Sequence, residues 1–411
     1  MGAEREKGKA EWLKRLGMLC FYAGLFLELI LVIVDKSAYT NPLEGQLFRV
    51  TFLLFLGKVC CTRYSLKEWL WLAFFLIIAG VCYVSSGRDE AVRLVIFCAS
   101  LKNVSLDKSL KFTFFITLAG CLLLVLLAVT GIYGNTYIID EGDRGIRYCF
   151  GLGHPNALYC MFWVLVTLGI YLYWEKMKLW MYGLIILAGI ILFIPTDSRT
   201  GILILLFTVT LSVILAYGKK IREQRILYMA AVVIFLACVG MSVWFAYYEP
   251  YEGPFYPYDR YFTGRITSMN TLENGGGMLR NWTLFSRPEN TKYFDLGYVR
   301  LFYWYGIIPG AVYVIMYAGL IWQCFRKKNY MGFMMVFSFA LYTMLEAHFI
   351  SVFVGRNYAL FLMGAWWSDM LYTKVRWGGT GREAPDQTEG IREEYWWQGW
   401  RFLRKRERCG L

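Results

Sequence analysis

The sequence predicts an all-α, polytopic integral membrane protein with about twelve transmembrane helices. Apolar and aromatic residues make up 58% of its 411 residues and charged residues only 18%, against roughly 25% in an ordinary globular domain. The apolar residues lie in runs that approach the about 20 residues needed to cross a bilayer. Lys and Arg gather in alternate segments between these runs. The same composition excludes a disordered chain, a collagen and a coiled coil.

The predicted spans follow one another closely along most of the chain. No small-residue cleavage site follows the first run, so we expect that run to stay as a helix. The fourth run is short and contains Arg93. In chain order the spans are Leu16–Val34, Leu47–Cys61, Trp69–Val84, Ala91–Leu101, Phe112–Gly134, Ala157–Trp174, Leu179–Pro195, Gly201–Tyr217, Ile226–Tyr247, Val299–Trp322, Tyr330–Ala347 and Tyr358–Leu371.

The basic residues orient these spans. With the N-terminus inside, the cytoplasmic segments hold 29 of the 43 Lys and Arg residues and the outer segments hold 14, as the positive-inside rule requires. Residues 1–15 then form a cytoplasmic N-terminus, residues 16–371 the transmembrane domain and residues 372–411 a cytoplasmic basic tail. We expect a multi-pass protein of the cell (plasma or inner) membrane with both termini cytoplasmic, and no nucleic-acid partner.

The outer segments are rich in arginine. They hold 12 Arg and 2 Lys, whereas the cytoplasmic segments hold 13 Arg and 16 Lys. Lysine is sufficient for topology, but the planar guanidinium grips phosphate oxygens in pairs. The outer face therefore indicates a phosphate-bearing ligand; pairing of these arginines with outer carboxylates is the alternative. The long outer loop between the ninth and tenth spans, residues 248–298, holds four of the nine prolines and is predicted to be a lid or binding element.

A metal centre and a cofactor are not expected. The chain has two histidines, and its 11 cysteines are scattered mostly through apolar runs without the spacing of a metal site. The candidate chemistry therefore lies with charged residues of the outer loops.

Two outer turns carry candidate anion-binding residues. Arg147 precedes a Gly-rich turn with His154 and Asn156 at the start of the sixth span, where free backbone N–H groups suit an anion; simple capping of the span by His154 and Asn156 is the alternative. Ser198 and Arg199 lie in the short turn between the seventh and eighth spans. There Arg199 is expected to face a phosphate, or else to be a snorkelling or salt-bridged turn residue.

Three further groups of residues lie in or after the long loop. Arg265 follows Gly264 inside the loop, and Asp295, Tyr298 and Arg300 stand where the loop re-enters the membrane. Partial desolvation is expected to raise the basicity of Asp295. The last outer turn holds Glu346, His348 and Arg356; a structural Glu346–Arg356 ion pair is the alternative to a role in binding or catalysis.

Four of these motifs occur in an order that resembles the O-antigen polymerase and ligase superfamily, most of all the Wzy-type polysaccharide polymerases. The resemblance spans roughly residues 140–360, and about twelve spans with one long, late outer loop fit it as well. The motifs are Arg147…Gly151-x-Gly-His154-Pro155-Asn156, Ser198-Arg199-x-Gly201, Thr263-Gly264-Arg265 and Asp295-x-x-Tyr298…Gly306.

The resemblance implies a GT-C-like helical scaffold and an inverting, metal-independent glycosyl transfer at the outer face. A growing glycan would move from undecaprenyl pyrophosphate onto another lipid-linked repeat unit, with flippase and chain-length regulator proteins as partners in the pathway. By motif, Arg199 and Arg265 would hold the pyrophosphate and Arg147 and His154 would line the same pocket. The other substrate-binding candidates are Asn156, Ser198, Tyr298, Arg300, Glu346, His348 and Arg356.

The fourth motif departs from the family in one respect. Ligases of this superfamily have His-Asn where this chain has Asp295-Leu296. The departure favours a polymerase over a ligase and makes Asp295 the candidate general base, with His154 and His348 as alternatives. A ligase-type transferase to another acceptor and a lipid-linked oligosaccharide flippase or other transporter stay open. Transporters tend to have broken helices and polar groups at the membrane midplane, whereas here only Pro309 interrupts a predicted span.

Overall fold

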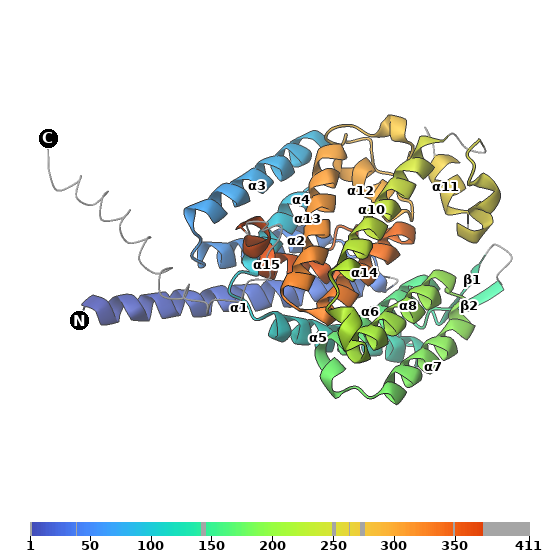
Figure 1. Ribbon diagram of the computed structural model, residues 1–411, viewed down its shortest axis with the longest axis horizontal. Coiled ribbons are helices and arrows are strands. Elements are labelled where there is room, and N and C mark those ends of the chain that lie inside the picture. Colours follow the sequence, from blue (N-terminus) through green and yellow to red (C-terminus); the bar gives the residue numbers. More distant parts are fainter. Residues whose placement is uncertain are drawn as a thin grey trace.

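The computed structural model describes residues 2–37, 39–140, 145–248, 252–262, 264–271, 276–347 and 350–372. The protein is mostly helical (Figure 1). The predicted basic tail, apart from Tyr372, and His348 lie outside the described residues. The elements are α1 (Gly2–Lys36), α2 (Glu44–Cys60), α3 (Leu66–Ser86), α4 (Glu90–Ser100), α5 (Leu106–Val129), β1 (Tyr137–Asp140), β2 (Gly145–Tyr148), α6 (Pro155–Tyr173), α7 (Leu179–Thr196), α8 (Arg199–Tyr217), α9 (Lys219–Arg222), α10 (Arg225–Tyr247), α11 (Arg265–Thr271), α12 (Gly297–Tyr305), α13 (Ile307–Arg326), α14 (Tyr330–Leu345) and α15 (Ala359–Tyr372), with short 3₁₀ helices η1 (Trp174–Lys176), η2 (Tyr256–Phe262), η4 (Leu279–Asn281) and η6 (Val354–Arg356).

Eight helices of the described chain are long and apolar enough to cross a membrane, as expected of a membrane-embedded protein. Four more helices coincide with predicted spans but are shorter: α2 has 17 residues, α14 has 16, α15 has 14 and α4 has 11. At 1.5 Å per residue, α4 is about 16 Å long, roughly half of a hydrocarbon core. The eight long helices are Ala10–Lys36, Leu66–Ser86, Leu106–Val129, Pro155–Lys176, Leu179–Thr196, Arg199–Tyr217, Arg225–Tyr247 and Ile307–Arg326.

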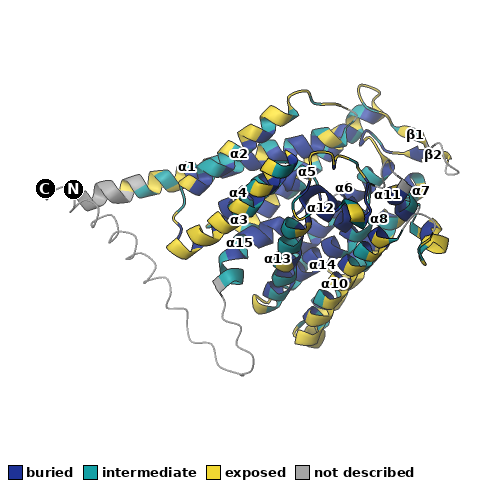
Figure 2. Ribbon diagram, turned by 90° about the horizontal axis from the view of Figure 1, so that it is seen from above, coloured by how far each residue is buried: buried dark blue, intermediate teal, exposed yellow. Residues whose placement is uncertain are grey.

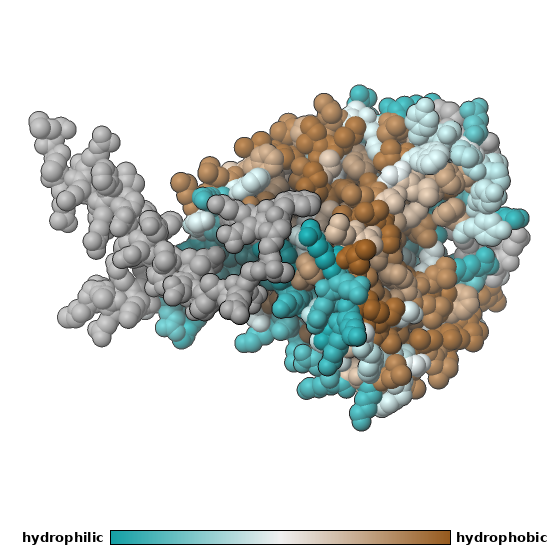
Figure 3. Space-filling model, viewed as in Figure 1, coloured by the Kyte–Doolittle hydropathy of each residue, from teal (hydrophilic) through white to brown (hydrophobic). Residues whose placement is uncertain are grey.

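Apolar side chains cover the outside of the bundle as well as its core. Ile77, Leu122, Ile194 and Val233 are exposed on α3, α5, α7 and α10, and apolar side chains spread over much of the face drawn in Figure 3. At the centre, every residue of α12 and most residues of α14 are buried (Figure 2). A water-soluble protein rarely exposes so much contiguous apolar surface. A bilayer, in contrast, solvates it.

A β-hairpin departs from the all-α expectation. β1 and β2 pair antiparallel, with Ile138 opposite Arg147. Gly145 at the start of β2 has φ +66°, in the left-handed region that favours glycine. In Figure 1 the hairpin lies near α11, far from the N-terminal end of α1. Its effect is to carry Arg147 to the ends of α6 and α7, as described below.

The predicted tenth span, Val299–Trp322, is not a single helix. It breaks at Gly306, which has φ +96° and ψ 169°, into α12 and α13. A Cβ on Gly306 would lie 2.5 Å from the Cα of Phe285 and 2.7 Å from the carbonyl oxygen of Leu284. The backbone of residues 284–286 therefore crosses directly over the break. Hydropathy alone did not reveal it, because both sides of the break are apolar.

The long segment 248–298 is built from short helices within its described part. It contains η2, α11 and η4, and it ends where α12 begins. Together with the ends of α1 and α14 and the starts of α6 and α8, it brings together the charged residues analysed below. We call this end of the bundle the Lys36 end, after the last residue of α1.

Replacing Gly306 tests the helix break. Gly306→Ala places a Cβ against the crossing backbone and forces an alanine into a positive-φ conformation, so we expect a loss of about 2 kcal/mol or more of stability. Gly80→Ala, at a helical glycine of α3 with open space around its Cβ position, is the matched control and should be neutral or slightly stabilising. Thermal unfolding of both variants in detergent measures the difference. Equal midpoints would contradict the described break.

Candidate functional site

The guanidinium of Arg265 joins two carboxylates at the Lys36 end. Its Nη2 lies 2.5 Å from Glu346 Oε1, and its Nε lies 3.3 Å from Asp295 Oδ2. The hydroxyl of Thr200 donates a third contact, to Glu346 Oε1 at 3.1 Å. Arg265 is only 7% exposed, so these charged hydrogen bonds form in a low-dielectric environment where each is strengthened. Four segments far apart in the sequence are joined by these contacts, and we call Arg265, Asp295, Glu346 and Thr200 the Arg265 cluster.

The backbone around Arg265 is fixed by a carboxylate that the sequence analysis did not single out. Buried Asp259 of η2 accepts hydrogen bonds from the backbone N–H of Ile266 and of Thr267, both at 2.9 Å. It thereby satisfies the free N–H groups at the start of α11. Gly264 supplies the positive φ (+74°) that turns the chain into this helix. The acceptor stands seven residues before Ile266, outside the usual capping distance, so no standard sequence signal marks it.

The two carboxylates of the cluster differ in their surroundings. Asp295 is 42% exposed and directly precedes Leu296, the N-cap residue of α12. Glu346 is 12% exposed and follows the last residue of α14. Burial raises the pKa of Glu346 to about 7, while the nearby Arg265 lowers it and Asp295 raises it. Near neutral pH the cluster therefore has an accessible carboxylate at Asp295 and a shielded one at Glu346 that can take up a proton.

Arg147 holds the neighbouring turns together. Its Nε donates to the carbonyl of Thr196 at 2.9 Å, at the end of α7, and its Nη2 donates to Asn156 Oδ1 at 2.9 Å, in the first turn of α6. Arg147 is buried, and its guanidinium N–H groups donate hydrogen bonds to these protein acceptors. Its position indicates a structural role in which the hairpin, α6 and α7 are tied together beside the cluster.

His154 and Asn156 form the cap of α6. His154 is the N-cap residue, and its Nδ1 accepts from the backbone N–H of Asn156 at 3.1 Å. The capping alternative is thus confirmed in geometry, and His154 is exposed. Ser198, the N-cap of α8, is buried, and its Oγ has no hydrogen-bond partner within the described chain.

Arg199 is the exposed cation of this region. It is 61% exposed and its Nε lies 3.5 Å from Asp197 Oδ1, the kind of surface pair that contributes little stability. Asp197 itself has a φ of +42° and ends α7. Arg199 directly precedes Thr200, which touches Glu346. Arg199 is therefore the salt-bridged turn residue that the sequence analysis gave as the alternative. Its guanidinium is nevertheless exposed to solvent next to the Arg265 cluster.

Three candidates on α12 and η6 have partners that the sequence did not indicate. The hydroxyl of Tyr298 donates to the carbonyl of Ala340 at 2.6 Å, which binds α12 to α14. Arg300 stacks on aromatic rings, as described further below. Arg356 forms its ion pair with Asp35 of α1.

The predicted Glu346–Arg356 ion pair is wrong. Glu346 pairs with Arg265, and Arg356 pairs with Asp35 and donates to Ser351 Oγ at 2.8 Å. The two residues are close in sequence, but the long loop delivers a nearer cation to Glu346, and α1 delivers a nearer carboxylate to Arg356. Both side chains form ion pairs, as expected, but each pairs with a different residue from the one predicted.

The described residues contain no group of three or more His, Cys, Asp or Glu side chains that could hold a metal ion. Comparisons of the chain with protein-family models, curated proteins and solved structures found no match. The charged side chains of the candidate site lie at the Lys36 end. What they offer is a paired set of carboxylates on one buried guanidinium, next to an exposed arginine.

The pKa of Glu346 predicts how stability depends on pH. Because the folded protein raises this pKa from 4.5 to about 7, it binds the proton more tightly than the unfolded chain does. The resulting stability is fully present below about pH 4.5 and is lost as the pH rises through about 7, by up to about 3 kcal/mol. Glu346→Gln, which cannot ionise, should lose this decline between pH 5 and pH 8 in thermal unfolding experiments. Glu252→Gln, at an exposed carboxylate of the long loop, should keep it, and an unchanged slope in Glu346→Gln would contradict the assignment.

Proposed function

We propose that this protein is a polysaccharide polymerase of the membrane. It transfers a growing glycan from undecaprenyl pyrophosphate onto a lipid-linked repeat unit, by an inverting and metal-independent reaction at the outer face of the cell membrane. The proposal includes a GT-C-like scaffold and both termini in the cytoplasm. Flippase and chain-length regulator proteins are its expected partners. The resemblance of the four motifs to Wzy-type polymerases and the distribution of Lys and Arg support this proposal.

The observation that carries the proposal is the Arg265 cluster. Three motifs of the resemblance, around residues 198–200, 264–265 and 295–298, contribute side chains to one contact network at one end of the bundle. Glu346, from the last turn at that end, completes it. A purely structural ion pair needs one carboxylate, whereas Arg265 is shared by two, and Asp295 is open to solvent.

The cluster supplies what an inverting glycosyl transfer requires. Asp295 takes the proton from the acceptor hydroxyl, whose oxygen then forms a bond to the anomeric carbon of the donor sugar. The bond between that carbon and the pyrophosphate oxygen breaks, and the pyrophosphate leaves with the electron pair. The motif led us to expect Arg265 at the pyrophosphate, but its guanidinium is buried and paired with two carboxylates. We therefore assign Arg265 to holding Asp295 in place, with Glu346 bound to its Nη2. Exposed Arg199 neutralises the charge that develops on the leaving pyrophosphate.

One observation favours a second candidate, a transporter of lipid-linked oligosaccharides. The break at Gly306 separates two helices within an apolar run, and broken helices are common in transporters. The break follows the buried helix α12, whose one charged residue is Arg300. A ligase-type transfer to another acceptor differs from polymerisation only in the acceptor.

Reconstitution tests the proposed function and Asp295 together. We expect the purified protein in nanodiscs to convert an undecaprenyl-pyrophosphate-linked repeat unit into a ladder of polymers, resolved by gel electrophoresis. Asp295→Asn should lower the initial rate about 10²- to 10⁴-fold, because the base is lost while the shape is kept. Glu289→Gln, at an exposed carboxylate of the same loop, is the control and should retain the wild-type rate. Binding without any product would favour the transporter, and full activity of Asp295→Asn would remove Asp295 as the base.

Replacing Arg199 tests the pyrophosphate contact. Arg199→Lys keeps the charge but loses the planar pair of donors, so we expect the rate to fall about 10-fold or more. Arg287→Lys, at an exposed arginine of the same predicted face, serves as the control. The measurement is the initial rate of ladder formation at saturating substrate. Wild-type turnover in Arg199→Lys would show that the pyrophosphate is held elsewhere.

A further inference from the structure

Arg300 is a buried cation without a counter-ion. It is 4% exposed, and no ion pair to it exists among the described residues. Its guanidinium carbon lies 3.5 Å from the ring centroid of Trp304 and 4.2 Å from that of Tyr293, and its Nε has no hydrogen-bond partner in the described chain. Arg265, by contrast, has two carboxylates. Tyr293 also makes a side-chain hydrogen bond to Arg300. A buried charge without an opposite charge beside it is still costly, and a bound anion would offset this cost.

Two more arginines border the same place. The guanidinium carbon of Arg88 lies 4.1 Å from the Trp304 ring centroid, and Arg88 pairs with Glu90 at 3.4 Å. Arg356 is paired with Asp35, donates to Ser351, and is near enough to Arg300 for the two like charges to repel each other. Glu90 is thus already neutralised by Arg88. We call Arg88, Arg300 and Arg356 the Arg300 group.

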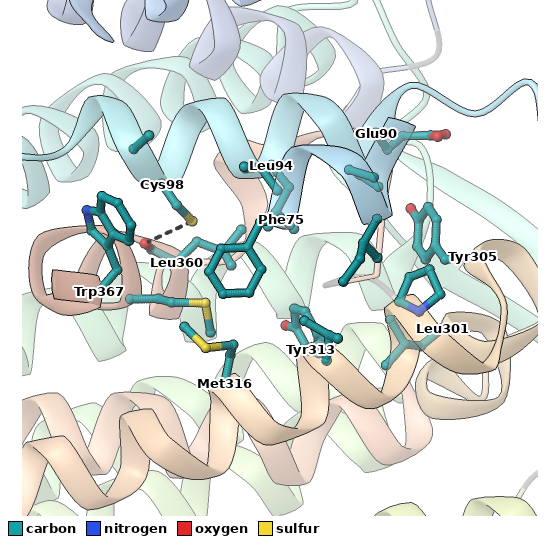
Figure 4. Close-up of a pocket in the computed structure, with 18 of the residues that line it drawn as sticks. Phe75, Glu90, Leu94, Cys98, Leu301, Tyr305, Tyr313, Met316, Leu360 and Trp367 are labelled. Atoms are coloured by element: carbon teal, nitrogen blue, oxygen red, sulfur yellow. Dashed lines mark hydrogen bonds between the residues drawn. The ribbon is translucent and has the colours of Figure 1, made fainter. Parts of the chain in front are cut away.

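An apolar pocket of about 140 Å³ has one end beside the Arg300 group, although none of the three arginines lines it. It lies between α3, α4, α13 and α15, and Glu90 and Ser351, the partners of Arg88 and Arg356, line it. Figure 4 shows Glu90 and Tyr305 at one end of the pocket and Trp367 at the other, with apolar side chains between them. Leu301 of α12 also lines it, directly after Arg300 in the chain. Arginines beside one end of an apolar pocket match a lipid with an anionic head.

The Arg300 group is close to the Arg265 cluster. Tyr293 interacts electrostatically with Arg300, with Arg356 and with Asp295. A sugar attached to an anion on Arg300 would therefore extend toward the accessible carboxylate. Arg199, the other candidate pyrophosphate ligand, approaches the cluster from the α7–α8 turn instead, through Thr200.

We propose that the Arg300 group and the apolar pocket form a second site for a polyprenyl diphosphate, separate from the Arg199 site. The diphosphate binds the guanidinium of Arg300, with Arg88 and Arg356 beside it, and the isoprenoid chain enters the pocket along α4. The inference rests on the proposed function, in which donor and acceptor are both polyprenyl diphosphates and one reaction needs two such sites. A transferase to an acceptor without this lipid would need only one.

Binding stoichiometry tests the second site. Native mass spectrometry of the full chain in nanodiscs with undecaprenyl diphosphate, which lacks sugars, should show two molecules bound to the wild type and one to Arg300→Met. Arg49→Met, at an exposed arginine near the start of α2, is the matched control and should bind two. Two molecules bound to Arg300→Met would overturn the inference. So would displacement of the second molecule by phosphatidylglycerol as readily as by undecaprenyl diphosphate, because the site would then hold an ordinary phospholipid.

A second variant keeps the test valid if Arg300→Met does not fold. Ala91→Phe fills the pocket from α4 without touching an arginine, and it should also reduce the stoichiometry from two to one while the thermal midpoint stays near that of the wild type. Retention of two molecules in a folded Ala91→Phe protein would overturn the assignment of the pocket.

Failure of the proposed function can be told apart from failure of the second site. A wild type that binds two diphosphates but makes no polymer refutes the polymerase and leaves the second site standing. A wild type that makes polymer but binds only one diphosphate supports the polymerase and refutes the second site.

Discussion

The contact between Arg265 and Glu346 is the interaction on which the arrangement of the site depends. It joins the long loop to the end of α14 inside a region from which water is largely excluded. Removal of one partner from such a buried pair is strongly destabilising, by roughly 3–5 kcal/mol, because the other charge stays behind. Thr200 and Asp295 add the start of α8 and the start of α12 to the same contact. The loop is thereby held in one place although its helices are short.

The distribution of polarity explains why the chemistry lies at one end. Apolar side chains form both the outside of the bundle and its core, so a charged group is tolerated only where a partner or water is available. At the Lys36 end the chain supplies such partners from α1, the β-hairpin, the long loop and η6. Each arginine there has a different environment. Arg147 donates to a backbone carbonyl, Arg265 pairs with carboxylates, and Arg300 stacks on aromatic rings. Arg199 alone among these four is largely open to solvent.

Hydropathy and residue chemistry predicted much of this protein. The apolar runs gave most helix positions to within a few residues, and Arg265, Asp295 and Glu346 were all candidates before the structure was known. The ion pairs between distant segments could not be predicted from the sequence, because the cation nearest to Glu346 comes from a loop 81 positions away. The break at Gly306 was missed because its cause is a crossing backbone. The β-hairpin was missed because its strands are only four residues long.

The most direct test of this account is a cryo-electron microscopy structure with a bound lipid-linked repeat unit. We expect the acceptor hydroxyl within hydrogen-bonding distance of the Asp295 carboxylate, with the Arg265 guanidinium still lying between Asp295 and Glu346 and diphosphate density beside an arginine of the Lys36 end. A ligand bound at the opposite end of the bundle, or an Arg265 paired with neither carboxylate, would contradict it.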